Sequence, residues 1–252
     1  MRPRTVLAPN PSAMTLDGTR TYIVGRVRTA VIDPGSSDPD HIEAIAAQVS
    51  GGNVVIIITH DHPDHSAGAH ELSERLNAPV LRFGDGSLAD DQLIDTDEGA
   101  LIALHTPGHT PDHISLHWPA ANAVFCGDLM MGGLDTALVA PPEGALGPYL
   151  ASLDRIGSLG PAVIYPAHGP PFDDPAAALA RYRAHRLDRE RQVVVGLEDR
   201  PLDEEGLMRV VYGDTVEPAL VPYARAALQA YLEHLEARRV IRKSLSDLWM
   251  LV

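Results

Sequence analysis

Short apolar runs of strand length recur along much of the chain, separated by polar loops. The clearest is Val-Val-Ile-Ile-Ile at residues 54–58, which is β-branched and too short for a typical helix. We expect further strands over residues 30–32, 100–104, 123–124 and 163–165. After Pro63, the placing of Gly68, Ala69, Leu72 and Leu76 predicts the start of a helix.

The run at residues 54–58 leads directly into Thr-His-Asp-His-Pro-Asp-His, which places three imidazoles and a carboxylate on a strand-to-helix loop. Neutral imidazole and carboxylate are ligands for Zn²⁺ and similar metals. His60 and His62 can point the same way on an extended segment, whereas Asp64 and His65 would face a second ion. A polar surface loop with a chance excess of histidine is the alternative, which the partners below disfavour.

Three later strand ends also deliver histidine or aspartate to loops. They are His-Thr-Pro-Gly-His-Thr at 105–110, Cys-Gly-Asp at 126–128 and Pro-Ala-His-Gly at 166–169. Groups arriving from one edge of a sheet converge in space without being close in sequence. Two divalent ions about 3.5–4 Å apart can then share a hydroxide and clamp the oxygens of a displacement. A structural zinc site often uses cysteines and is closed, so a chain with 1 Cys favours hydrolysis.

The motifs THDHPDH, TPGHT, CGD and PAHG together resemble the metallo-β-lactamase superfamily, over roughly the first 170 residues. The resemblance implies an α/β fold, an αββα sandwich, with a two-metal site on one edge. It also implies two divalent ions, zinc foremost, with manganese or iron as alternatives. By this resemblance the first metal is held by His60, His62 and His109, the second by Asp64, His65 and His168, and Asp128 bridges them. Asp64 and Asp128 are the predicted catalytic carboxylates.

The start of the chain and its C-terminal part resemble one group within that superfamily. The stretches PNPSAMTLDGTRTYIVG and VIDPGS are similar to the β-lactamase-like protein 2 group. A turn-rich stretch at 169–175 predicts a boundary between a catalytic domain, 1–172, and a helical domain, 173–252. The helical domain resembles a winged helix, with helices expected over 176–197, 204–211 and 217–237 and short strands over 240–242 and 249–252.

The formal net charge of −14 disfavours an indiscriminate nucleic-acid binder. Residues 1–172 carry 8 Lys+Arg against 20 Asp+Glu. Two basic clusters stand out in the C-terminal part, and a solvated helix face or wing is the plain interpretation of each. They are Arg181, Arg183, Arg186, Arg189 and Arg191, and then Arg238, Arg239, Arg242 and Lys243.

We therefore expect a dinuclear-metal-dependent hydrolase whose metal-bridged hydroxide attacks a thioester or another small acyl substrate. A single-strand RNA endonuclease, the activity that the group resemblance suggests, is one alternative, and a non-catalytic metal-binding module is another. Antibiotic-hydrolysing relatives often have a cysteine ligand where Asp128 falls here, which argues against β-lactamase activity. We expect no signal peptide, and no run approaches 18 apolar residues. With a lone Cys126, this favours a cytoplasmic protein without membrane contact.

Three further residues have open roles. Asp33 follows a strand and either orients the histidine loop, as ligating histidines commonly need, or is a plain turn aspartate. His113 either contacts substrate or, as we favour, satisfies nearby backbone groups. Arg20 stands where the related group has asparagine, and it would favour an anionic substrate if that position contacts substrate.

Overall fold

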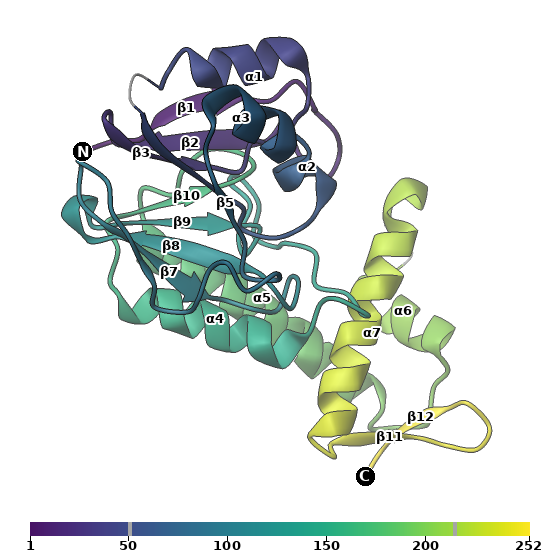
Figure 1. Cartoon of the computed structure of the whole chain (residues 1–252). Helices are drawn as coiled ribbons and strands as arrows, with labels where there is room; N and C mark the ends of the chain where they lie inside the picture. Colours follow the sequence, from purple (N-terminus) through teal and green to yellow (C-terminus); the bar gives the residue numbers. More distant parts are fainter. Residues whose placement is uncertain (50–51, 214–215) are drawn as a thin grey trace.

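Two sheets lie face to face in the computed structural model, which describes residues 1–49, 52–213 and 216–252 (Figure 1). The first sheet contains, in spatial order, β1 (Arg4–Leu7), β2 (Arg20–Val24), β3 (Arg28–Ile32), β4 (Asn53–Ile57) and β5 (Val80–Leu81). The second contains β10 (Val163–Pro166), β9 (Ala123–Gly127), β8 (Ile114–Trp118), β7 (Leu101–His105) and β6 (Leu93–Ile94). The apolar runs of the sequence are thus confirmed as strands.

Aromatic and β-branched side chains fill the space between the sheets. Tyr22 and Ile57 of the first sheet share one buried cluster with Trp118, Phe125 and Tyr165 of the second. The ring centroids of Tyr22 and Phe125 lie 5.1 Å apart in a tilted arrangement. Because large rings bury the most apolar area, these contacts fix the two sheets against each other.

Helices cover the outer face of each sheet (Figure 1). On the first sheet, α1 (Pro39–Ala46) and α3 (Ala69–Leu76) contribute apolar side chains to one cluster with β2, β3 and β4. On the second, α4 (Leu146–Ser158) and α5 (Pro175–Gly196) pack against β9 and β10. The predicted αββα layering is confirmed.

The helix expected after Pro63 is in fact two helices. A single turn, α2 (Pro63–Ser66), ends before Gly68, and α3 begins after it. A Cβ atom at Gly68 would lie 2.3 Å from the carbonyl oxygen of Ser36 and 2.6 Å from that of Pro34. The backbone approaches the loop after β3 too closely for a side chain, and the helix is interrupted there.

The C-terminal part contains α5, α6 (Glu204–Tyr212), α7 (Val221–Ala237) and a hairpin of β11 (Ile241–Lys243) and β12 (Trp249–Leu251), close to the predicted ranges. Short 3-10 helices occupy Pro119–Ala121 (η1) and Pro218–Leu220 (η2). One apolar core joins Tyr149 and Leu153 of α4 to Tyr182 of α5 and Tyr231 of α7. The boundary at residue 172 stays a prediction. In the described residues, every helix is too short or too polar to cross a membrane.

Candidate metal centre

All seven side chains expected to bind metal lie at one edge of the sandwich. They are delivered by the segments that follow β4, β7, β9 and β10. Their ligand atoms form two groups, and within each group these atoms lie within 4.8 Å of one another. The groups are His60, His62 and His109, and then Asp64, His65, Asp128 and His168.

In the first group, three ring nitrogens converge. The Nε2 atom of His60 lies 2.9 Å from Nδ1 of His62, which lies 3.1 Å from Nε2 of His109. Burial lowers the pKa of His60 well below its ordinary value and also lowers the pKa of His109. Both rings are therefore neutral at pH 7, and neutral imidazole is the form that binds metals.

The other nitrogen of each histidine has its own partner, and this fixes which nitrogen carries the proton. Thr59 Oγ1 donates to Asp33 Oδ2, so it can accept from Nδ1 of His60. The remaining partners are Glu143 Oε2 for His62 Nε2 (3.0 Å), Leu138 O for His109 Nδ1 (2.8 Å), Asp33 Oδ2 for His65 Nδ1 (2.9 Å) and Gly18 O for His168 Nδ1 (3.4 Å). Since these oxygens accept, the inward nitrogens are left with free lone pairs.

The second group is centred on Asp128. Its Oδ1 lies 3.3 Å from Nε2 of His65 and 3.3 Å from Nε2 of His168, and its Oδ2 lies 3.7 Å from Nε2 of His109 in the first group. Oδ2 of Asp64 lies 3.3 Å from Nε2 of His168. Asp128 therefore lies between the two groups.

In the part of the chain that the structure describes, three buried polar atoms of this second group have no hydrogen-bond partner. They are Nε2 of His65, Nε2 of His168 and Oδ1 of Asp128. Burial alone would lower the pKa of His65, but the carboxylates of Asp128 and Asp33 raise it well above its ordinary value. The raised pKa means that these carboxylates favour a positive charge at this position, and a divalent cation that replaced the proton on Nε2 of His65 would supply that charge.

Asp33 connects the first sheet to the histidine loop. Its carboxylate accepts from the backbone N–H of Thr59 (2.8 Å), from the Thr59 hydroxyl (2.8 Å) and from His65. It adopts a φ of 51°, a left-handed conformation that aspartate tolerates better than most residues. Asp33 thus contacts the loop that carries the ligands, besides making a turn.

His113 satisfies backbone groups, as favoured from the sequence. Its Nε2 accepts from the backbone N–H of Asp128 (3.1 Å), and its Nδ1 contacts the carbonyl oxygen of Thr106 (3.1 Å). Burial lowers its pKa to about 3, so the ring is neutral. It holds the backbone at Asp128.

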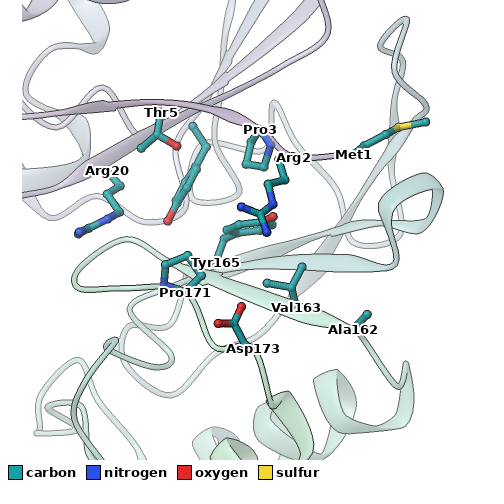
Figure 2. A pocket seen from close by; sticks show the side chains of 11 residues that line it. Met1, Arg2, Pro3, Thr5, Arg20, Ala162, Val163, Tyr165, Pro171 and Asp173 are labelled. Carbon is teal, nitrogen blue, oxygen red and sulfur yellow. The ribbon is translucent and has the colours of Figure 1, made fainter.

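The side chain of Arg20 lines a different cavity from the one at the metal centre. Both of its terminal nitrogens donate to the carboxylate of Asp17, at 2.9 and 2.7 Å. It lines a cavity of about 680 Å³ together with Tyr165 and Asp173 (Figure 2). The hollow at the metal centre is a different one, of about 190 Å³, lined by Met14, His62, Asp64, His109, Asp128, Met131, Ala137 and Leu138. A contact between Arg20 and substrate stays a prediction.

Comparison with known proteins agrees with this geometry. The model of the metallo-beta-lactamase superfamily matches residues 14–89 and 82–168. The chain belongs to the metallo-β-lactamase superfamily.

Individual relatives extend over nearly the whole chain. An atrochrysone carboxyl ACP thioesterase of Aspergillus chevalieri is 32% identical over 245 residues, covering 91% of this chain and 78% of its own. A beta-lactamase-like protein 2 homolog of Drosophila melanogaster is 32% identical over 270 residues, covering 96% and 90%. The crystal structure of a beta-lactamase domain protein from Burkholderia ambifaria superposes with a TM-score of 0.82 at 18% identity, covering 99% and 91%.

Sequence reasoning missed several residues around this metallo-β-lactamase centre. Thr59, Glu143 and the carbonyl of Leu138 contact the outer nitrogens of ligand histidines, and Met14 and Met131 line the hollow. Of these, Thr59 alone adjoins the histidine motif. The others come from segments without periodicity, where nothing local indicates a role.

Proposed function

We propose that this metallo-β-lactamase superfamily member is a dinuclear-metal hydrolase acting on a small acyl thioester. The observation that carries the proposal is a polar centre that opens directly onto a largely apolar hollow. Met14, Met131, Ala137 and Leu138 line that hollow beside the ligand side chains. Such a site suits a substrate with one reacting polar group and an apolar part.

Two divalent ions, zinc foremost, fit the two groups of ligand atoms. His60, His62 and His109 would hold one ion, and Asp64, His65 and His168 the other, with Asp128 shared. When bound, such a pair supplies a water activated at neutral pH and polarises the acyl carbonyl. The acyl part of the substrate lies, in this proposal, against the two methionines.

Asp64 is the carboxylate best placed to handle a proton at the hollow. Burial would raise its pKa, but contact with His168 lowers it below the ordinary value, so the group is ionised at neutral pH. Its side chain keeps 29% of its exposure and lines the hollow. Its Oδ2 atom faces Nε2 of His168 and would hold the second ion, so its other oxygen is the one left to accept a proton from water beside the acyl carbon.

The name of the Aspergillus chevalieri relative, a thioesterase acting on an acyl carrier protein, supports acyl chemistry. We further propose that residues 173–252 form a winged-helix-like domain, because Leu202 bridges to Trp249 beside the β11–β12 hairpin. Its arginines do not form one open basic face: Arg181, Arg183 and Arg238 are each paired with a carboxylate. This disfavours RNA as the substrate.

A substrate panel tests the proposal. The protein loaded with Zn²⁺ or Mn²⁺ is offered S-acyl-N-acetylcysteamine thioesters, simple lactones and a fluorescent single-stranded RNA. We expect release of thiol from the thioesters, lost in His62→Ala and retained in His70→Ala, a matched exposed histidine. Cleavage of RNA alone, lost in the same His62→Ala variant, would replace the acyl proposal. A protein that binds metal but cleaves nothing in the panel would support the non-catalytic alternative.

A further inference from the structure

The segment between β9 and α4, residues 128–145, forms one wall of the hollow. Side chains of α5 hydrogen-bond to the backbone of this segment. Two residues of this segment that line the hollow, Met131 and Ala137, are both contacted by buried side chains of α5. The residues between them, 133–135, are exposed. The wall is thus attached on either side of an exposed turn.

Tyr182 makes the first attachment. Its hydroxyl donates to the carbonyl oxygen of Met131 (2.7 Å) and accepts from the backbone N–H of the same residue (2.8 Å). The tyrosine side chain is fully buried. One hydroxyl therefore satisfies both backbone polar groups of a residue that lines the hollow.

Arg186 makes the second. Its guanidinium donates to the carbonyl oxygen of Ala137 and to the hydroxyl of Tyr231 (3.2 Å), and it lies 5.0 Å from the ring centroid of Tyr149. The residue is 2% exposed. Among the described residues, no carboxylate lies within 4.0 Å of the guanidinium nitrogens. A buried charge needs strong partners, and here they are a carbonyl dipole, a hydroxyl and an aromatic face.

The two attachments act on one wall because Tyr182 and Arg186 are four residues apart on α5 and so lie on the same helix face. The wall also reaches the ligands. Leu138, next to Ala137, accepts from Nδ1 of His109 at 2.8 Å. A shift of the segment at Ala137 would change the width of the hollow. Through Leu138, it would also change the orientation of the His109 ring.

We propose that Tyr182 and Arg186 are positioning residues that set the width of the apolar hollow and thereby the acyl group that the enzyme accepts. This inference rests on the proposed thioester hydrolysis. The hollow has a volume of about 190 Å³, and a movement of this wall would change the room beside the ligand side chains. The C-terminal part thus contributes to substrate selection without contacting substrate.

The test compares Tyr182→Phe and Arg186→Gln with Arg183→Gln, a control on the same helix whose exposed guanidinium pairs with Asp154. For each, kcat/KM is measured on acetyl, butyryl, hexanoyl and octanoyl N-acetylcysteamine thioesters. Since one methylene in an apolar pocket changes kcat/KM by about tenfold or more, we expect the octanoyl-to-acetyl ratio to rise at least about fivefold in both variants. The control should keep the wild-type ratio. An equal fall for every chain length would mean a merely structural role and overturn the proposal.

A second measurement is independent of catalysis. Amide hydrogen exchange of residues 129–139 should accelerate at least about tenfold in Arg186→Gln, with β9 and α5 unchanged, because the segment opens locally. Tyr231→Phe removes one hydroxyl and serves if the glutamine variant does not fold. Unchanged exchange in these variants refutes the attachment. If the wild type cleaves no thioester, the proposed function fails while the exchange result still decides whether α5 holds the wall.

Discussion

The histidine-rich stretch at residues 59–65 and the arginine-rich stretch at 181–191 look alike in sequence, since each concentrates one kind of polar side chain. In the structure they have opposite fates. The first stretch follows β4, where the chain turns at the sheet edge. His60 and His62 belong to one group of ligand atoms there, and His65 belongs to the neighbouring group. The histidines that are close in sequence are therefore also close in space.

The arginines lie on a helix, whose 3.6-residue turn sends neighbouring side chains in different directions. Arg181 pairs with Asp135, Arg183 with Asp154 and Arg191 with Asp188, whereas Arg186 enters the core. A cluster makes a site when the backbone brings its members to one point. On a helix it becomes a set of separate contacts.

The largest effect is expected from removing metal. The converging side chains of the histidine-rich stretch imply that metal ions bind there. We predict two metal ions per chain by elemental analysis after refolding with excess Zn²⁺ or Mn²⁺. Chelation should abolish hydrolysis, and metal should restore it. A content of no more than about 0.2 ions per chain would show that the converging nitrogens serve another purpose.

Asp128→Ala tests the proposed bridging carboxylate, whose Oδ2 lies 3.7 Å from Nε2 of His109 in the first group. Without the shared carboxylate both ions are held less well, so we expect kcat/KM to fall at least about a hundredfold while the protein stays folded. Asp95→Ala, which removes an exposed carboxylate from the loop between β6 and β7, is the control and should be near wild type. Wild-type turnover in Asp128→Ala at saturating metal would contradict a two-metal mechanism.

Asp33→Asn tests the support beneath the histidine loop. Asparagine tolerates the left-handed φ of 51° and keeps its size, so the main loss is the charge facing His65. We expect metal affinity to fall about 10–100-fold, measured by competition with a chromophoric chelator. Asp40→Asn, exposed on α1, controls for loss of a carboxylate. Equal affinity in both variants would leave Asp33 as a turn residue.

Glu143→Gln should have a smaller effect. The glutamate contacts Nε2 of His62, but its side chain is 61% exposed, so solvent screens the charge. Glutamine still offers an oxygen that accepts a hydrogen bond. We expect metal affinity about threefold weaker, by the same competition assay. A loss as large as that of Asp33→Asn would show that exposure is a poor guide here.

The smallest effect is expected from Arg238→Glu, Arg239→Glu and Arg242→Glu combined. Thioester kcat/KM should be unchanged, and single-stranded RNA should bind weakly, with little dependence on salt in either protein. If RNA were the substrate, log affinity would fall with log salt at about −0.7 per phosphate contacted, and the triple variant would flatten that slope. RNA cleavage at about 150 mM salt, abolished by His62→Ala, would contradict the contrast between the histidine-rich stretch and the arginine-rich part of the chain.

The sequence predicted what backbone regularity determines. Strand runs ending in His or Asp predicted that four loops would meet at one edge, because strand ends follow a repeating pattern, and the family resemblance implied which seven side chains of those loops would bind metal. It did not predict Glu143 or Leu138, since a single carboxylate or carbonyl on an irregular loop carries no periodic signal. Nor did it show that Arg186 is buried while Arg183 is exposed, which depends on how α5 packs against α4 and α7. The interruption at Gly68 arose from contact with a loop more than thirty residues earlier.

The hydroxyl of Tyr182 on the backbone of Met131 has a consequence for the order of events during synthesis. Every ligand candidate has left the ribosome before α5 does, yet the wall at Met131 and Ala137 is fastened by residues translated some fifty positions later. A nascent chain can gather its histidines and carboxylates early while the cavity beside them still lacks its final shape. Folding of this protein would then end with the step that sets its substrate selectivity, after the metal-binding side chains are already in place.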